Sequence, residues 1–160
     1  MGDTTSSTTG SKKAPARESA RRKEDTLRRL EQDVDAWVST AGADGLPYLT
    51  PLSFVWHDGY LLMVTRTTNP TARNARATGR AYVSLGHTRD VVLIEAEVEA
   101  VPVEALGEAE GEAFVAKLRW DVRSDAAYTF LRFRPVTVTA WREVNELAGR
   151  HLMRDGAWLV

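Results

Sequence analysis

The residues best suited to chemistry surround a predicted helix start at Asn69 and Pro70. Asparagine is a favoured helix N-cap and proline a favoured first helical residue, and Gly79 suits the helix end. A helix start offers unpaired backbone N–H groups and the positive end of the helix dipole, and Arg66 and Arg73 add charged donors nearby. These residues fit a phosphate-binding corner, and they fit equally a capped helix whose arginines are solvated.

Other kinds of catalytic site have little support in the sequence. It contains no cysteine, which excludes thiolate catalysis, thiolate metal sites and disulfides. Its three histidines occur in separate predicted turns or loops, without the spacing of a metal site: His57, His87 and His151. Three glutamates alternate along one predicted strand, a pattern typical of a solvated sheet face: Glu95, Glu97 and Glu99. We therefore expect no metal site, and no single catalytic side chain is indicated.

The elements that would position this corner are mostly strands. Alternating apolar and polar residues predict strands at 33–41, 48–56, 60–65, 80–85, 91–101, 128–134 and 136–141, and a last hairpin that ends in 157–160. Helical patterns cover 24–32, 69–79 and 104–120. The chain is thus predicted to be mainly β, with six to seven antiparallel strands and two or three short helices. Because an open sheet would leave exposed edges, a small closed barrel is expected, and apolar residues on its outside would favour a dimer.

The first 23 residues are rich in Ser, Thr, Gly, Lys and Arg and nearly free of apolar side chains. Such a segment cannot offset the entropy of ordering, so residues 1–23 are predicted to form a disordered tail and 24–160 a single domain. No apolar run approaches the roughly 18 residues of a membrane span, and no signal peptide is visible. A cytoplasmic location is therefore expected. A net charge of −1 gives no general attraction to nucleic acid or to a membrane surface.

Three motifs follow one another along the chain. They are Asp44-Gly45-x-Pro47-x-x-x-Pro51-Leu52-x-Phe54, then Thr65 followed by Pro70-Thr71-Ala72-Arg73-Asn74-x-x-x-x-Gly79-Arg80, then Pro135 and Trp141 followed by Arg150. With the order of the elements, they resemble the split-barrel flavoproteins, a family that includes pyridoxamine 5'-phosphate oxidase and the reductases that use the deazaflavin coenzyme F420. The resemblance runs from about Val34 to the C-terminus. It implies a split β-barrel that binds a flavin, usually FMN, with the second motif as the phosphate-binding segment.

The resemblance also implies which residues would contact the cofactor. They are Thr50, Pro51, Leu52, Thr65, Arg66, Thr71, Arg73, Asn74, Arg89 and Trp141. Leu52, Thr65 and Trp141 would lie near the flavin ring. Ordinary core or dimer packing is an alternative interpretation of Trp141.

Two of these positions depart from the family pattern. Thr50 stands where the oxidase has an arginine, and Thr71 where the family commonly has a lysine, and both positions normally meet the phosphate. Arg66, Arg73 and Arg89 are the candidates to replace the two missing charges.

The function implied is that of an FMN-dependent oxidoreductase, which transfers hydride between the flavin and a small substrate in a homodimer. Two alternatives stay open: an F420-dependent reductase on the same fold, and a non-enzymatic module that stores flavin or haem. The activity of pyridoxamine 5'-phosphate oxidase itself is not implied, since its basic substrate-binding motifs are not reproduced in 146–153.

Overall fold

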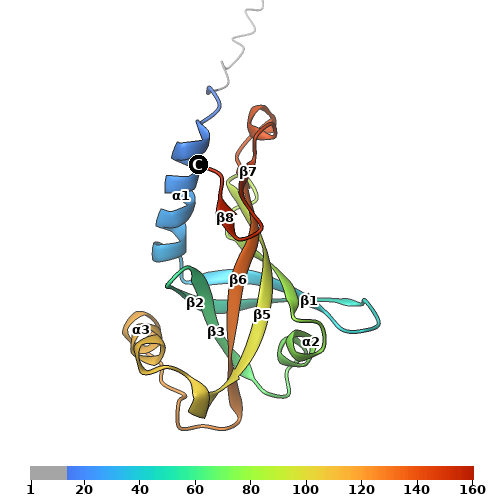
Figure 1. The fold of residues 1–160 in the computed structure, drawn as a ribbon, viewed down its shortest axis with the longest axis vertical. Coiled ribbons are helices and arrows are strands. Elements are labelled where there is room, and N and C mark those ends of the chain that lie inside the picture. The colour runs from blue at the N-terminus through green and yellow to red at the C-terminus, as the bar shows by residue number, and fades with distance from the viewer. Residues whose placement is uncertain (1–13) are drawn as a thin grey trace, which may run out of the picture.

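The computed structural model describes residues 14–160. Within this range eight strands are present: β1 (Asp35–Ala41), β2 (Pro47–His57), β3 (Tyr60–Arg66), β4 (Arg80–Leu85), β5 (Val91–Pro102), β6 (Tyr128–Trp141), β7 (His151–Arg154) and β8 (Ala157–Trp158). They form one antiparallel sheet in the order β3-β2-β1-β4-β5-β6-β7-β8. Because β3 also pairs with β6, the first six strands close into a barrel, and β7 and β8 extend beyond it (Figure 1). The predicted mainly β barrel is confirmed.

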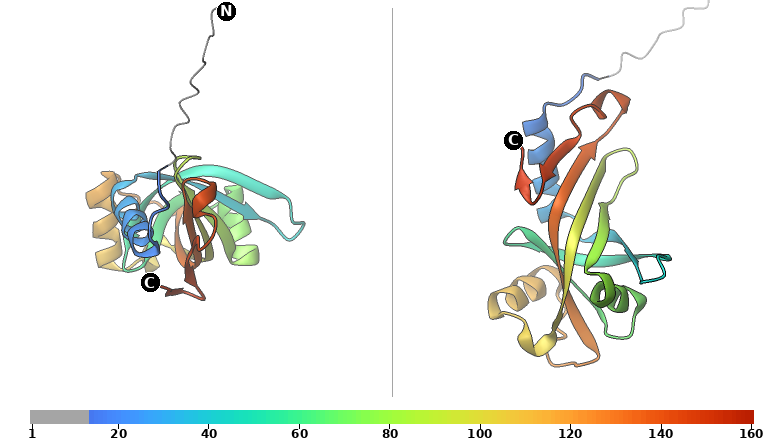
Figure 2. Two further views of the ribbon diagram at one scale, coloured as in Figure 1. Left: turned by 90° about the horizontal axis from the view of Figure 1, so that it is seen from above. Right: turned by 45° about the vertical axis from the view of Figure 1, so that its right-hand side comes forward.

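Three helices pack on the outside of the barrel in the described part of the chain: α1 (Ser19–Gln32), α2 (Pro70–Thr78) and α3 (Glu108–Leu118). Two short 3₁₀ turns cover Val103–Ala105 and Val144–Glu146. Helix α1 lies beside the β7–β8 hairpin at one end of the molecule, whereas α2 and α3 lie towards the other end (Figure 1, Figure 2). None of the helices within residues 14–160 is long and apolar enough to cross a membrane.

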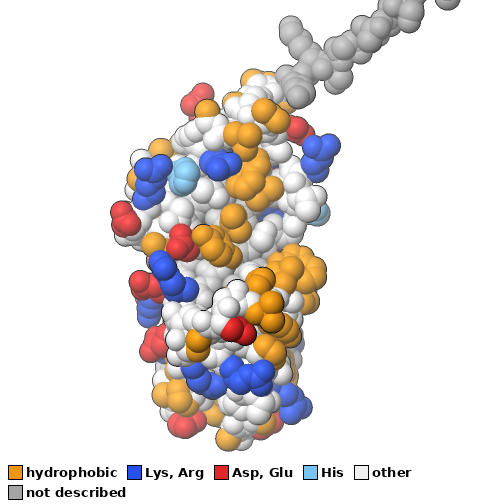
Figure 3. All heavy atoms as spheres, turned by 90° about the vertical axis from the view of Figure 1, so that its right-hand side faces the viewer, with side chains coloured by type: hydrophobic (Ala, Val, Ile, Leu, Met, Phe, Trp, Pro, Cys, Tyr) orange, Lys and Arg blue, Asp and Glu red, His pale blue; other side chains and the backbone are white. Residues whose placement is uncertain are grey.

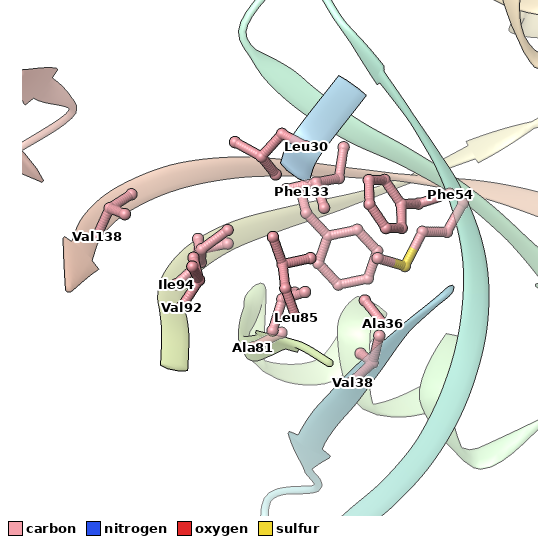
Figure 4. Close-up of a cluster of buried hydrophobic side chains, with 14 of the residues drawn as sticks. Leu30, Ala36, Val38, Phe54, Ala81, Leu85, Val92, Ile94, Phe133 and Val138 are labelled. Atoms are coloured by element: carbon pink, nitrogen blue, oxygen red, sulfur yellow. The ribbon is translucent and has the colours of Figure 1, made fainter. Parts of the chain in front are cut away.

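The barrel encloses one large hydrophobic core. Phe54, Met63 and Phe133 are fully buried in it, together with aliphatic residues of β1, β4 and β5 (Figure 4). Leu30 of α1 covers one part of this core. Strands β1, β4 and β5 alternate buried and more exposed residues along their length, as expected for a sheet with one buried face.

Strand β3 does not alternate, because it is covered on both faces. Leu61 and Met63 point into the barrel core, whereas Leu62 and Val64 belong to a second cluster that packs against α3. Phe114 of α3 anchors that cluster through an edge-to-face contact with Phe130, with ring centroids 5.2 Å apart. Helix α3 is thereby fixed against the barrel beside β3.

The local signals placed α2 correctly, and two other helices differ from the prediction. Helix α2 begins at Pro70 and ends at Thr78, and the C-cap Gly79 has a left-handed φ of 64°, a conformation that favours glycine. Helix α1 begins at Ser19, five residues before the predicted start. Its first turns are held by contacts with distant parts of the chain and therefore carry no local apolar signal. The rest of the predicted tail includes residues 1–13, which lie outside the described residues.

Helix α3 is shorter than predicted: residues 104–107 belong to a 3₁₀ turn and a connection, and Arg119 ends the helix with a positive φ of 57°. Strand β6 runs without a break through Pro135, where an interruption was predicted. The register of β5 and β6 shifts by one residue there, so that Glu95 faces Thr137 and Ala96 faces Pro135. Such a β-bulge is one of the few places where a strand accommodates a proline.

Candidate functional site

A pocket of about 320 Å³ lies where β2 and β3 meet the start of α2. Its lining residues come from β2, β3, the turn before α2, α3, the connection after α3 and β6: Pro51, Leu52, Ser53, Val64, Thr65, Arg66, Asn69, Phe114, Trp120 and Tyr128. Four of the predicted cofactor residues are therefore brought together here: Pro51, Leu52, Thr65 and Arg66. The pocket combines an apolar, aromatic wall with a polar corner at the end of β3.

The polar corner is built from the turn between β3 and α2. The side chain of Asn69 does not cap the helix; instead its Nδ2 donates to Oγ1 of Thr65 at 2.8 Å. The first backbone N–H groups of α2 thus have no side-chain cap, at the positive end of the helix dipole, and the residues that carry them, Thr71 and Ala72, are 1% and 0% exposed. Helix starts are common positions for phosphate groups in proteins.

Arg66 is the cation of this corner. Its side chain is exposed, and its guanidinium lies 5.4 Å from the ring centroid of Tyr128. None of the ion pairs in the described part of the chain includes Arg66. Its charge is therefore free for an anionic ligand.

Arg73 and Arg76 hold the turn rather than line the pocket. Arg73 donates from Nη1 to the carbonyl oxygen of Thr68 at 2.7 Å, and Arg76 donates from Nη1 to that of Thr67 at 2.9 Å. Both side chains are exposed and have no carboxylate partner among the described residues. They add positive charge around the 67–69 turn while they fix its path.

Three further predicted residues lie close to the corner without lining the pocket. Thr71, the second residue of α2, is 1% exposed, and Asn74 donates from Nδ2 to Oγ1 of Thr40 at 3.2 Å. Thr50 pairs with Val38, whose side chain is in the barrel core. The two threonines that stand at usually basic positions thus have structural surroundings.

A second pocket, of about 260 Å³, lies on the outer face of β4, β5 and β6 and contains Trp141. Its lining residues are Tyr82, Leu93, Glu95, Thr137, Thr139, Trp141, Arg150 and His151. The guanidinium of Arg150 stacks over the Trp141 ring at 5.2 Å from its centroid. Arg89 lies in the nearby loop between β4 and β5, where its exposed side chain is 3.7 Å from Glu143.

Trp141 and Thr65, both predicted to lie near a flavin ring, are far apart in one chain. Thr65 pairs with Thr129 at the start of β6, and Trp141 is twelve residues further along the same strand. At about 3.3 Å per residue this is a path of up to roughly 40 Å. Arg89 lies at the Trp141 end as well, since it precedes Val91, which pairs with Trp141. Within one chain the ten predicted residues therefore form two groups and not one.

The wall of the first pocket is fixed by a buried charge cluster on α3. Glu110 accepts hydrogen bonds from Arg132, at 2.6 Å to each carboxylate oxygen, and from the hydroxyl of Tyr60 at 2.5 Å. The Arg132 guanidinium holds the pKa of Glu110 down at about 2. Burial, with the Glu110 contact, raises the pKa of Tyr60 to about 12. This cluster secures α3 and so presents Phe114 to the pocket.

The aromatic wall was not identified from the sequence. Phe114 lies within α3, Trp120 follows the end of that helix, and Tyr128 begins β6; Trp120 and Tyr128 meet edge to face, with centroids 5.4 Å apart. From the sequence, Phe114 and Trp120 were placed only in a helix at 104–120 and Tyr128 at the start of a strand. Their approach to β2 and β3 depends on the closure of the barrel.

A sequence profile of the pyridoxamine 5'-phosphate oxidase family matches residues 23–142. The chain belongs to this family, which confirms the resemblance drawn from the three motifs. No curated protein matches the whole sequence closely enough to be counted as a relative.

Several solved structures share the fold. A protein described as an F420 reductase is 19% identical, with a TM-score of 0.56, over 70% of this chain and 94% of that chain. A FAD-binding protein from Mesorhizobium loti is 20% identical, with a TM-score of 0.55, over 72% and 90%. The haem storage protein HutZ from Vibrio cholerae is 15% identical, with a TM-score of 0.57, over 70% and 89%. At these identities the likeness establishes the shared barrel.

Proposed function

We propose that this protein is a homodimeric, FMN-dependent oxidoreductase, with the flavin phosphate at Arg66 and the start of α2. The observation that carries the proposal is the first pocket, where Asn69 at the start of α2 and a cation without a carboxylate partner among the described residues adjoin an aromatic wall. Each charge-assisted hydrogen bond contributes roughly 1.5–3 kcal/mol, so a phosphate held at this corner would anchor the cofactor. The remaining affinity would come from contact of the flavin ring with Leu52 and the aromatic side chains.

A second copy of the chain would complete the site. The outer face of the barrel exposes large apolar side chains on adjacent strands, with Trp37 48%, Leu49 60% and Tyr82 49% exposed. Ser39 pairs with Leu49 on one side and with Tyr82 on the other, so these side chains lie on one face. Figure 3 shows hydrophobic side chains in a band along the side of the molecule. A contiguous apolar face of this kind favours a protein interface.

A two-fold interface across this face explains why the predicted residues form two groups. In a two-fold dimer the same patch of each chain meets its copy, so a site at one end of the patch can face the opposite end in the partner. The Trp141–Arg150 pair of one chain would then lie against the flavin ring held by the other. Trp141 offers stacking area, and Arg150 offers a donor to the ring oxygens or to a substrate.

The flavin supplies the hydride chemistry when it is bound. The ten residues that line the first pocket include no carboxylate, histidine or lysine. The contribution of these residues is therefore to bind the phosphate, orient the ring and exclude water. Substrate selection falls to the rim, where Trp120 and Arg66 are exposed.

Coenzyme F420 is the alternative cofactor, because it would also be an anion with a flavin-like ring. Three exposed arginines without carboxylate partners among the described residues surround the β3–α2 turn: Arg66, Arg73 and Arg76. This charge would suit an acidic tail longer than a single phosphate. A non-enzymatic store of flavin or haem is the second alternative. Such a protein would bind its ligand in the pocket without catalysing a reaction.

Purified protein titrated with FMN, F420 and haem tests the proposal. We expect FMN to bind in the micromolar range or tighter, with loss of flavin fluorescence, and the bound flavin to be reduced by NADH or NADPH. Tighter binding of F420 than of FMN would favour the first alternative. Bound FMN that no nicotinamide reduces and no acceptor reoxidises would favour a store. A protein that binds none of the three would eliminate all of these functions.

A further inference from the structure

A buried charge cluster joins the N-terminal segment to the loop that follows β6. Arg17 binds Glu146 with both ends of its guanidinium, at 2.9 Å from Nε to Oε1 and 2.8 Å from Nη2 to Oε2. Its Nη1 donates to Asp25 at 2.9 Å, and its backbone N–H also donates to Glu146 at 2.9 Å. Glu146 is 3% exposed and Asp25 5% exposed. We call this cluster of Arg17, Asp25 and Glu146 the α1 clasp.

The clasp extends directly to the residue after Trp141. The second carboxylate oxygen of Glu146 accepts the backbone N–H of Arg142 at 2.8 Å. The side chain of Arg142 in turn lies 3.1 Å from Asp90, in the loop between β4 and β5. The Glu146 carboxylate thus links Arg17 to the backbone beside Trp141. Strong hydrogen bonding to Arg17 holds the pKa of Glu146 at about 2, so the contact is charged at neutral pH.

The side chain of Arg22 binds backbone carbonyl oxygens of the same region. This arginine is 5% exposed and donates from Nη1 to the carbonyl oxygens of Ala140, at 3.4 Å, and Glu146, at 3.1 Å. Its Nη2 also approaches Gly149, at 3.6 Å from the position a Cβ would occupy there. Gly149 has a φ of 66° and precedes Arg150. The Arg22 guanidinium therefore lies against the end of β6, the 3₁₀ turn and the end of the loop.

The segment held in this way carries the Trp141–Arg150 pair at its two ends. Arg150 stacks on Trp141, and its carbonyl oxygen accepts the backbone N–H of Ala140 at 3.0 Å. The loop side chains Glu143, Val144 and Leu147 are exposed and add little packing. The buried contacts of this loop thus come from α1 and the residues just before it, and Arg17 and Arg22 both lie outside the family match of 23–142.

We infer that Arg17 and Glu146 are positioning residues, which fix the Trp141–Arg150 pair in the geometry that receives a ligand on the outer face. The functional part of this inference rests on the proposed flavin site, and the structural part does not. A clasp that merely fastened α1 to the barrel would affect stability alone. A positioning clasp controls the surroundings of Trp141 while the barrel stays folded.

Fluorine NMR on protein labelled with 5-fluorotryptophan tests the structural part without any ligand. The sequence has five tryptophans, and a Trp141→Phe variant assigns the resonance of interest. In Arg17→Ala and Glu146→Gln we expect the Trp141 resonance to shift or broaden, while those of Trp37 and Trp120 stay in place. Leu30→Ala is the matched control, since it destabilises α1 in the core without touching the loop. An unmoved Trp141 resonance in both clasp variants would overturn the inference.

Arg17→Lys serves as the second form of the test where Arg17→Ala does not fold. Lysine keeps the positive charge but cannot bind a carboxylate with two parallel hydrogen bonds. We expect it to shift the Trp141 resonance less than Arg17→Ala or Glu146→Gln does. An equal or larger shift in the charge-retaining variant would contradict the role assigned to the two-point contact.

FMN titration tests the functional part. Loss of the Arg150 stack by Arg150→Ala should weaken FMN binding by about twofold to thirtyfold. Arg17→Ala should weaken it comparably, and adding Arg17→Ala to Arg150→Ala should cause little further loss, because both changes disable one unit. Additive losses, or unchanged affinity in Arg17→Ala, would overturn positioning for the flavin. If the wild-type protein bound no flavin, the proposed function would fail, and the Trp141 resonance would still decide whether the clasp orders the pair.

Discussion

Replacing Arg66 by glutamine should selectively weaken the binding of phosphorylated flavins. Arg66 borders the pocket with no carboxylate partner among the described residues, so its charge is available to a phosphate. A charge-assisted hydrogen bond contributes roughly 1.5–3 kcal/mol. In the structure the guanidinium rests over Tyr128, and leaving that exposed cation–π contact costs about 0.5 kcal/mol. The net loss in Arg66→Gln is then about 1–2.5 kcal/mol, or roughly 5- to 70-fold in affinity for FMN.

Riboflavin separates the contribution of the phosphate from that of the ring, because it has the same ring as FMN without the phosphate. We expect the wild-type protein to bind FMN more tightly than riboflavin, and Arg66→Gln to remove most of that difference while riboflavin affinity stays nearly constant. Fluorescence quenching by titration measures both ligands under the same conditions, at one stated ionic strength. Arg76→Gln is the matched control, since Arg76 is also an exposed arginine of this turn but does not line the pocket. Equal losses for FMN and riboflavin in Arg66→Gln would refute the phosphate assignment.

Three further predictions concern stability and assembly. Glu110→Gln removes the carboxylate that binds the partly buried Arg132 and the Tyr60 hydroxyl, leaving Arg132 a longer contact with Glu99 at 3.5 Å, and should lower the free energy of unfolding in urea by about 1–3 kcal/mol; an unchanged free energy of unfolding would contradict the role of this cluster in securing α3. Glu110 and Glu146 both have a pKa near 2, below the ordinary 4.5. Their contribution, up to about 3 kcal/mol each, is complete above about pH 5 and lost as the pH falls towards 2; urea midpoints that stay constant from pH 6 to pH 3 would disagree. Leu49→Asp places a charge on the apolar outer face and should convert the proposed dimer to a monomer in sedimentation; a monomeric wild-type protein, or a dimer unchanged by Leu49→Asp, would exclude this interface.

The features predicted well from the sequence are those with local signals. Helix α2 was placed by asparagine and proline at its start and glycine at its end, each of which acts within one turn. Strands β4 and β5 were placed by simple alternation of apolar and polar residues. The resemblance to the flavoprotein family then supplied the closure of the barrel, which alternation alone only favoured. Pro51, Leu52, Thr65 and Arg66 line one pocket because β2 and β3 are neighbours in both sequence and sheet.

The features that were missed depend on contacts between distant segments. Phe114 and Trp120 reach the pocket because α3 is fastened to β3 and β6 by Glu110, which no local pattern reveals. Helix α1 extends to Ser19 because Arg22 finds carbonyl acceptors more than a hundred residues away. A polar composition was interpreted as a sign of disorder, although a guanidinium with enough acceptors can be buried as firmly as an aliphatic side chain.

Strand β6 explains why assembly and function are linked in the proposal. It carries Tyr128 against Arg66 in the polar corner at one end and Trp141 against Arg150 at the other, so one rigid strand determines the positions of both groups. No bending of a hydrogen-bonded barrel strand could bring these two ends to one small ligand. If both groups contact the same flavin, they must come from different chains, and flavin affinity must then fall with dilution as the dimer dissociates. A monomer that bound FMN with full affinity would leave the first pocket as the whole site and Trp141 as a packing residue.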